Sequence, residues 1–134
     1  MAAVLLGHML LKEGIKGIEV FSRGTNAWPG QPLTEGARQA LQAVGVETGT
    51  HYSQSLARKD VEQADRIYVM TERHRQTVTA DYPRAKDKTR LLAAADIADP
   101  VGSSPRDYEK CRIDIQNALV DLISSLKSEG SSKS

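Results

Sequence analysis

The chain has 134 residues, about the length of one domain, of which 40% are apolar and 26% are charged. This composition excludes a disordered chain and a collagen-like repeat, and the single cysteine, Cys111, excludes a disulfide scaffold. A net charge of +1 gives no field that would attract nucleic acid or an anionic membrane, so neither is expected as a partner.

The sequence carries no sign of export or membrane insertion. The apolar run over residues 2–7 ends at His8, so it is too short to span a bilayer. It also lacks the basic start and the small-residue cleavage site of a signal peptide. Because a lone cysteine fits a reducing compartment, we expect a cytoplasmic protein.

Periodicity and capping signals divide the chain into alternating helices and strands. Apolar residues at helical spacing define the helices, and short β-branched or continuously apolar runs define the strands. Thr34, Ser55 and Thr71 stand at predicted helix starts, where their hydroxyl oxygens would accept a backbone N–H. The pattern predicts helices over residues 1–11, 34–44, 56–64, 72–80 and from 103 or 104 to 127, and strands over residues 17–22, 66–70 and 91–95.

Strands separated by helices predict an α/β fold with an open parallel sheet and helices on both faces. We expect one domain over residues 1–127, followed by a disordered polar tail over residues 128–134. Ligands of such sheets bind beyond the carboxyl ends of the strands. The loops that carry Trp28 and Asp99 would therefore open onto one face.

Asp99 is the first candidate for chemistry. It follows the third predicted strand and precedes Pro100, which places a carboxylate where it can transfer a proton. An Asp-Pro pair also starts ordinary turns, and on spacing alone that alternative is favoured. Asp96, three residues earlier, either shares the site or is simply solvated.

Two further residues lie on predicted loops. Trp28 is a pocket wall that could stack on a planar substrate group, or else a cover over the edge of the core. His51 either orients a neighbouring loop by hydrogen bonds or is an ordinary surface histidine. The three histidines are far apart in the sequence and lack metal-ligand spacing, so we expect no metal ion and no cofactor.

Cys111 is interpreted as a packing residue. It lies inside the last predicted helix, where backbone N–H groups are already bonded and cannot stabilise a thiolate. No phosphate-binding glycine loop, dinucleotide fingerprint or paired-cysteine motif occurs in the chain.

Several stretches together resemble the low-molecular-weight protein tyrosine phosphatase family along nearly the whole chain. The resemblance rests on residues 20–28 with their Ser-Arg-Gly-Thr and Trp, on residues 51–53, on residues 64–71 and on the Asp-Pro loop at residues 96–102. It implies a flavodoxin-like fold and phosphomonoester hydrolysis through a cysteinyl-phosphate intermediate, without a metal ion. The substrate would be a phosphorylated protein or a small phosphoester.

The resemblance also implies roles for individual residues. Asp99 would be the general acid, Trp28 would line the substrate cleft, and Ser22 and His51 would support the phosphate loop. The family's phosphate loop (Cys, five residues, Arg, then Ser or Thr and Pro) would stand directly before the first helix, and the chain contains no such motif. We therefore expect an N-terminally truncated family member that lacks the first strand and is inactive by itself. We expect it to be marginally stable, dimeric or strand-swapped, or else repaired by its two flanking strands closing up.

Three functions stay open at this point. The family's tyrosine-directed members carry aromatic residues after Asp-Pro, whereas Val101 and Gly102 follow here, which resembles the branch that contains protein-arginine phosphatases. A non-catalytic pseudophosphatase that binds a partner is the third alternative. Arsenate reductases of this fold need further cysteines, which this chain does not have.

Overall fold

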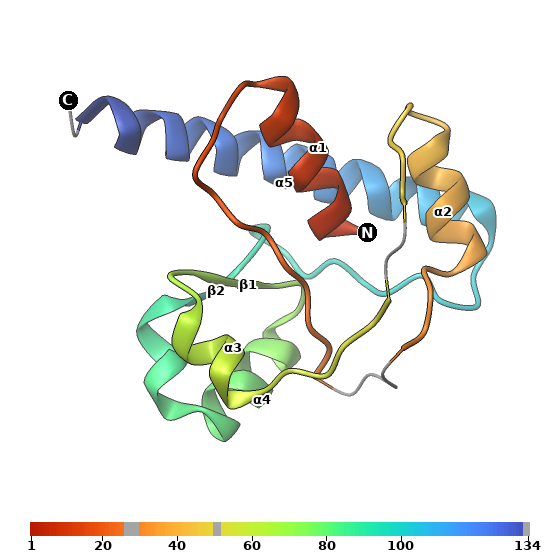
Figure 1. Ribbon diagram of the computed structural model, residues 1–134. Helices are drawn as coiled ribbons and strands as arrows, with labels where there is room; N and C mark the ends of the chain where they lie inside the picture. The colour runs from red at the N-terminus through yellow and green to blue at the C-terminus, as the bar shows by residue number, and fades with distance from the viewer. Residues whose placement is uncertain (26–29, 50–51, 133–134) are drawn as a thin grey trace.

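The structure is a computed structural model that describes residues 1–25, 30–49 and 52–132. Figure 1 shows one long helix on one side of the molecule and a small sheet with shorter helices on the other. The elements are α1 (Ala2–Lys12), α2 (Glu35–Gln42), α3 (Arg58–Gln63), β1 (Ile67–Val69), α4 (Glu72–Asp81), a 3-10 helix (Pro83–Lys88), β2 (Thr89–Leu91) and α5 (Pro105–Ser132).

The two strands form a parallel sheet, as predicted. Ile67 is paired with Thr89 and Val69 with Leu91, and the Leu92 N–H extends the pairing to the Val69 carbonyl at 2.8 Å. The helix α4 packs against both strands, while α5 passes on the opposite side of the sheet (Figure 1). The α/β class with a parallel open sheet is therefore confirmed.

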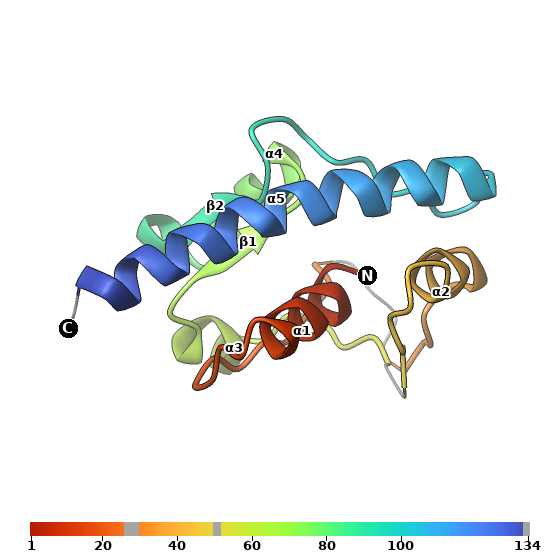
Figure 2. The ribbon, with the colours of Figure 1, turned by 90° about the horizontal axis from the view of Figure 1, so that it is seen from above.

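The main core is aliphatic and lies where α1, α2 and α5 meet. Both α1 and α2 pack along α5, as the view from above shows (Figure 2). Their buried side chains and those of two loops form one cluster: Leu5, Leu41, Val46, Ile97, Cys111, Ile115 and Leu119. A second, smaller cluster lies under the sheet and consists of Val61, Val69, Val78 and Ala85. The first cluster brings the start of α1, the loop after β2 and the first half of α5 together.

The predicted strand over residues 17–22 is wrong. This segment has no regular secondary structure, and its side chains Ile18 and Phe21 are exposed. The only strand-like pairing nearby, within the described residues, is an isolated bridge between Gly24 and Ser55. A strand needs a neighbour to bond its N–H and C=O groups, and no described strand lies beside this segment.

Three boundaries also differ from the prediction. The strand expected at residues 91–95 is β2, two residues earlier, because the parallel register with β1 ends at Leu91. The helix expected from residue 56 under a Ser55 cap begins at Arg58, where the Asp60 carboxylate accepts the Ala57 N–H at 3.0 Å. The helix α5 continues to Ser132, beyond the predicted end at residue 127.

The helices over residues 1–11, 34–44 and 72–80 are confirmed as α1, α2 and α4. Thr34 and Thr71 cap α2 and α4 as predicted, accepting the N–H groups of Ala37 at 3.4 Å and His74 at 3.1 Å. Within the described residues, no helix is both long enough and apolar enough to cross a membrane.

Candidate active site

The loop after β2, here called the acid loop (residues 96–102), is hydrogen-bonded to the end of β1 and to the start of α4. The buried Ile97 donates its N–H to the Met70 carbonyl at 2.9 Å, directly after β1. The Asp96 carboxylate accepts the N–H of Glu72, the first residue of α4, at 3.0 Å. These two contacts hold the acid loop at the carboxyl end of β1, the expected edge for a site.

Asp99 lies in a tight turn on this loop and is exposed. Its Oδ1 accepts the Val101 N–H at 3.0 Å, and the Pro100 carbonyl accepts the Ser103 N–H at 2.8 Å. Gly102 has a φ of 80°, a backbone conformation that residues other than glycine rarely adopt. The turn therefore presents a carboxylate to solvent with its backbone position fixed.

The N-terminal end of α1 leaves its first backbone N–H groups without a side-chain acceptor. No side chain caps this end, and its first turn contains no acidic residue. The first N–H groups of a helix carry partial positive charge and bind anions readily. Met1 packs against the main core, which also contains Ile97 of the acid loop.

The end of α1 and Asp99 are electrostatically coupled. Burial lowers the pKa of the Met1 amino group, and electrostatic interactions with Cys111 and with the Asp99 carboxylate oppose this shift. The start of α1 and the acid loop contact the same main core, through Met1 and Ile97.

Cys111 packs in the main core, in agreement with its interpretation as a packing residue. Burial raises the pKa of its thiol, and the negative charge of Asp99 raises it further. The protonated thiol is a poor nucleophile, since attack requires the thiolate. Its place beside the acid loop was not predicted, because residue spacing does not reveal which loop covers a helix.

The other predicted site residues are not brought together by described contacts. Trp28 and His51 lie outside the described residues. Ser22 is exposed, and its carbonyl oxygen accepts a hydrogen bond from Arg23 at 2.8 Å. The Asp96 carboxylate caps α4, a contact that the sequence did not predict.

Arg23 has a structural partner that the sequence did not indicate. Its Nε lies 3.1 Å from the buried carboxylate of Asp60, and its guanidinium stacks over the Phe21 ring at 4.8 Å. The pair ties the segment around Arg23 to α3. No signal in the sequence joins these two positions, which are 37 residues apart in numbering.

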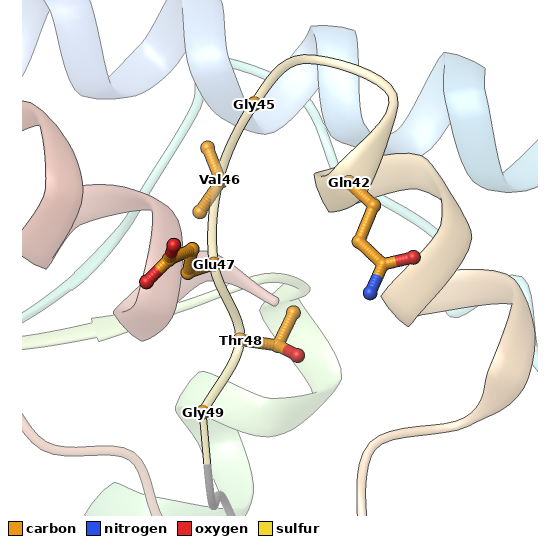
Figure 3. A pocket seen from close by; sticks show the side chains of 6 residues that line it. All are labelled: Gln42, Gly45, Val46, Glu47, Thr48 and Gly49. Atoms are coloured by element: carbon orange, nitrogen blue, oxygen red, sulfur yellow. The ribbon is translucent and has the colours of Figure 1, made fainter.

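A surface hollow of about 510 Å³ lies beside the segment that follows α2, but it contains none of the predicted site residues. Figure 3 shows its lining, in which Gln42 and Thr48 project to one side of the segment and Glu47 to the other. A binding pocket has polar groups that converge on one point, and here Glu47 points away from the other two. Among the described residues, no cluster of histidine, cysteine or carboxylate side chains could hold a metal ion.

Comparison with known proteins identifies consistent relatives. The family model of the low molecular weight phosphotyrosine protein phosphatases matches residues 1–132. A protein-arginine-phosphatase of Geobacillus stearothermophilus is 31% identical over 96% of this chain and 88% of its own length. The low molecular weight protein-tyrosine-phosphatase Ptp of Acinetobacter johnsonii is 24% identical over 87% of this chain and 84% of its own length.

Solved structures agree with the fold. The YwlE arginine phosphatase from Geobacillus stearothermophilus superimposes with a TM-score of 0.87 at 30% identity, covering 96% of this chain and 84% of that one. A low molecular weight protein tyrosine phosphatase from T. tengcongensis gives the same TM-score at 25% identity, covering 92% and 88%. The small sheet and the helices around it are thus arranged as in these enzymes.

Proposed function

Because this chain belongs to the low molecular weight phosphotyrosine protein phosphatase family, we propose that it supplies the general acid, Asp99, and the helix end of a phosphohydrolase site. The nucleophile is not among these 134 residues, since no cysteine is followed at the family's spacing by arginine. Catalysis then requires a phosphate loop of the family joined to the N-terminal end of α1.

In the first chemical step, the loop cysteine thiolate attacks phosphorus, so that a P–S bond forms and the bond to the leaving oxygen or nitrogen breaks. Asp99, protonated before the step, gives its proton to the leaving atom, which would otherwise depart with negative charge. The N–H groups at the start of α1 stabilise the charge on the remaining phosphate oxygens.

In the second step, the Asp99 carboxylate takes a proton from water, which attacks phosphorus. The P–S bond breaks, inorganic phosphate leaves and the thiolate is restored. A solved arginine phosphatase that is 29% identical to this chain is described as a cysteine-to-serine mutant with a phosphorylated active site serine. That relative supports a covalent intermediate at the cysteine position.

One observation carries this proposal. Met1, at the uncapped end of α1, packs against the main core that contains Ile97 of the acid loop, although the two residues lie 96 positions apart in the sequence. A phosphoryl group at the helix end would therefore meet a proton donor from the acid loop.

The experiment joins the strand and phosphate loop of the Geobacillus relative ahead of Met1, giving what we call the joined enzyme. We expect the joined enzyme to hydrolyse p-nitrophenyl phosphate and the 134-residue chain to show no turnover. Serine in place of the added cysteine should abolish hydrolysis, whereas Cys111→Ser should retain it, because Cys111 is a packing residue. A joined enzyme that binds phosphopeptides without turnover would instead indicate a binding module.

A second candidate substrate is phosphoarginine. The arginine phosphatase relatives of Geobacillus stearothermophilus and Bacillus subtilis are 31% and 29% identical to this chain, compared with 24% for the Acinetobacter tyrosine phosphatase. The exposed Val101 after Asp-Pro also differs from the aromatic residues of tyrosine-directed members. Comparing kcat/KM of the joined enzyme on phosphoarginine and phosphotyrosine peptides of one sequence decides between the two.

The remaining predicted roles belong to the same proposal. Trp28 would form the cleft wall, so Trp28→Ala should raise KM with little change in kcat, since a stacked wall binds ground and transition states alike. Ser22 and His51 would hold the phosphate loop.

We place the protein in the cytoplasm, and we expect the isolated chain to dimerise or exchange strands. A sharp, concentration-independent melt above ~65 °C would contradict that last expectation.

A further inference from the structure

The N-terminal end of α4 has two caps of different origin. Thr71, the residue before the helix, accepts the His74 N–H at 3.1 Å. Asp96, which is 24 residues away from Glu72 in sequence, accepts the Glu72 N–H at 3.0 Å. Each cap satisfies a different one of the unpaired N–H groups in the first turn, and only the Asp96 cap joins α4 to a loop that is distant in sequence.

The second cap fixes the acid loop. The loop leaves β2 after Leu92 and is next bonded to the rest of the protein at Asp96 and at Ile97, whose N–H bonds to the Met70 carbonyl at 2.9 Å. Asp99 follows Ile97 by only two residues, and its own described bond, to the Val101 N–H, is internal to the turn. The position of the Asp99 carboxylate therefore depends on the contacts at residues 96 and 97.

We propose that Asp96 is a positioning residue: its carboxylate, bonded to the first N–H of α4, sets where Asp99 stands relative to the N-terminal end of α1. This inference rests on the proposed function, because it assigns Asp96 to the same site. Asp96 does not touch the phosphoryl group. It acts by keeping the acid-loop backbone against the start of α4, while the buried Ile97 side chain holds the loop to the main core.

The chain as it exists allows a direct test by amide hydrogen exchange and NMR. Asp96→Ala should speed exchange of the Glu72 N–H, and should also broaden or shift the Val101 and Ser103 amide signals. Asp96→Asn should behave nearly as wild type, since the asparagine side-chain oxygen still accepts the hydrogen bond. Thr71→Ala is the matched control, because it removes the other cap of α4 without touching the acid loop.

The joined enzyme provides the catalytic readout. A misplacement of about 1 Å can lower a rate by about 10²-fold, so Asp96→Ala should reduce kcat on phenyl phosphate by about tenfold to a hundredfold. On p-nitrophenyl phosphate, whose leaving group needs little protonation, the loss should be much smaller, and KM should change little. Thr71→Ala should lower both rates equally or leave both unchanged.

The outcomes separate this inference from the proposed function. If Asp99→Asn is impaired but Asp96→Ala matches Thr71→Ala in exchange and in leaving-group dependence, Asp96 is only a helix cap and the inference is wrong. If Asp99→Asn leaves the rate unchanged, the proposed function fails, while the exchange data still report whether Asp96 orders the loop. If Asp96→Ala does not fold, the same exchange measurement is made on Asp96→Ser. Faster exchange at the Val101 and Ser103 amides of Asp96→Ser would support the inference, and unchanged exchange would overturn it.

Discussion

Gly36 stands in the first turn of α2, where α2 packs against α5, and we predict that Gly36→Ala destabilises the protein. A Cβ atom at this position would lie 2.7 Å from Cζ of Tyr108 and closer still to Cε2 and Cδ2 of the same ring. Ordinary carbon contacts are about 3.5–4.0 Å, so the ring would have to move by roughly 1 Å. Tyr108 is only 6% exposed and packs with Ala37 and Ala40, which leaves it little room.

The magnitude follows from two opposing effects. Replacing glycine by alanine in a helix normally stabilises it by roughly 0.5–1 kcal/mol, less in the first turn. Overpacking a filled core costs about 1–3 kcal/mol, so the net loss in free energy of unfolding should be about 1–2 kcal/mol. Gly7→Ala is the matched control: no atom lies within 4 Å of its Cβ position, and it should stabilise α1.

Urea unfolding of the two variants and of Gly36→Ala/Tyr108→Ala measures these effects. The double variant should show a favourable coupling energy, because the smaller side chain at position 108 removes the clash. Equal stability changes in Gly36→Ala and Gly7→Ala would refute the packing of α2 on α5. The contact matters for function because Tyr108 lies in the first turn of α5, directly after the acid loop.

Two further predictions concern buried groups. Burial and the Asp99 charge raise the pKa of the Cys111 thiol, so iodoacetamide should modify the native protein slowly at pH 8 and rapidly in urea. Asp99→Asn should speed the reaction of the native protein, because it lowers the pKa of the thiol. An unchanged rate would contradict the interaction between Asp99 and Cys111. Asp60→Ala should lower the free energy of unfolding by about 2–4 kcal/mol, because it leaves Arg23 and the Ala57 N–H without their buried acceptor. The control Glu62→Ala, on the exposed side of α3, should lower it by less than about 0.5 kcal/mol.

Local signals in the sequence predicted the helices well. Thr34 and Thr71 cap α2 and α4 because a hydroxyl before a helix needs only the next three residues to make its bond. Ser55 failed as a cap because the competing carboxylate of Asp60 lies inside the first turn and starts the helix later. Capping is thus predictable where one acceptor is available, and ambiguous where two are.

The strands were harder to predict because their partners are distant in sequence. Residues 17–22 have the composition of a strand but no described neighbour, so their pattern alone misled. The apolar run over residues 91–95 fits a strand in more than one register, and only the pairing of Leu91 with Val69 decides where β2 ends. Strand existence and limits depend on tertiary contacts that periodicity does not contain.

The candidate site was predicted in part. The Asp-Pro pair indicated Asp99, and the alternation of strands and helices placed its loop at the carboxyl edge of the sheet. The bond from Asp96 to the start of α4 and the position of Cys111 beside the acid loop join residues far apart in the sequence. Neither follows from spacing.

The most direct test of the central claim is the effect of Asp99→Asn on the joined enzyme with phenyl phosphate, a substrate with a poor leaving group. If Asp99 is the general acid, kcat should fall by ~10² to 10⁴ with little change in KM, and Asp96→Asn should be far less impaired. A wild-type kcat for Asp99→Asn on that substrate would contradict the assignment of Asp99 and, with it, the proposed function of the acid loop.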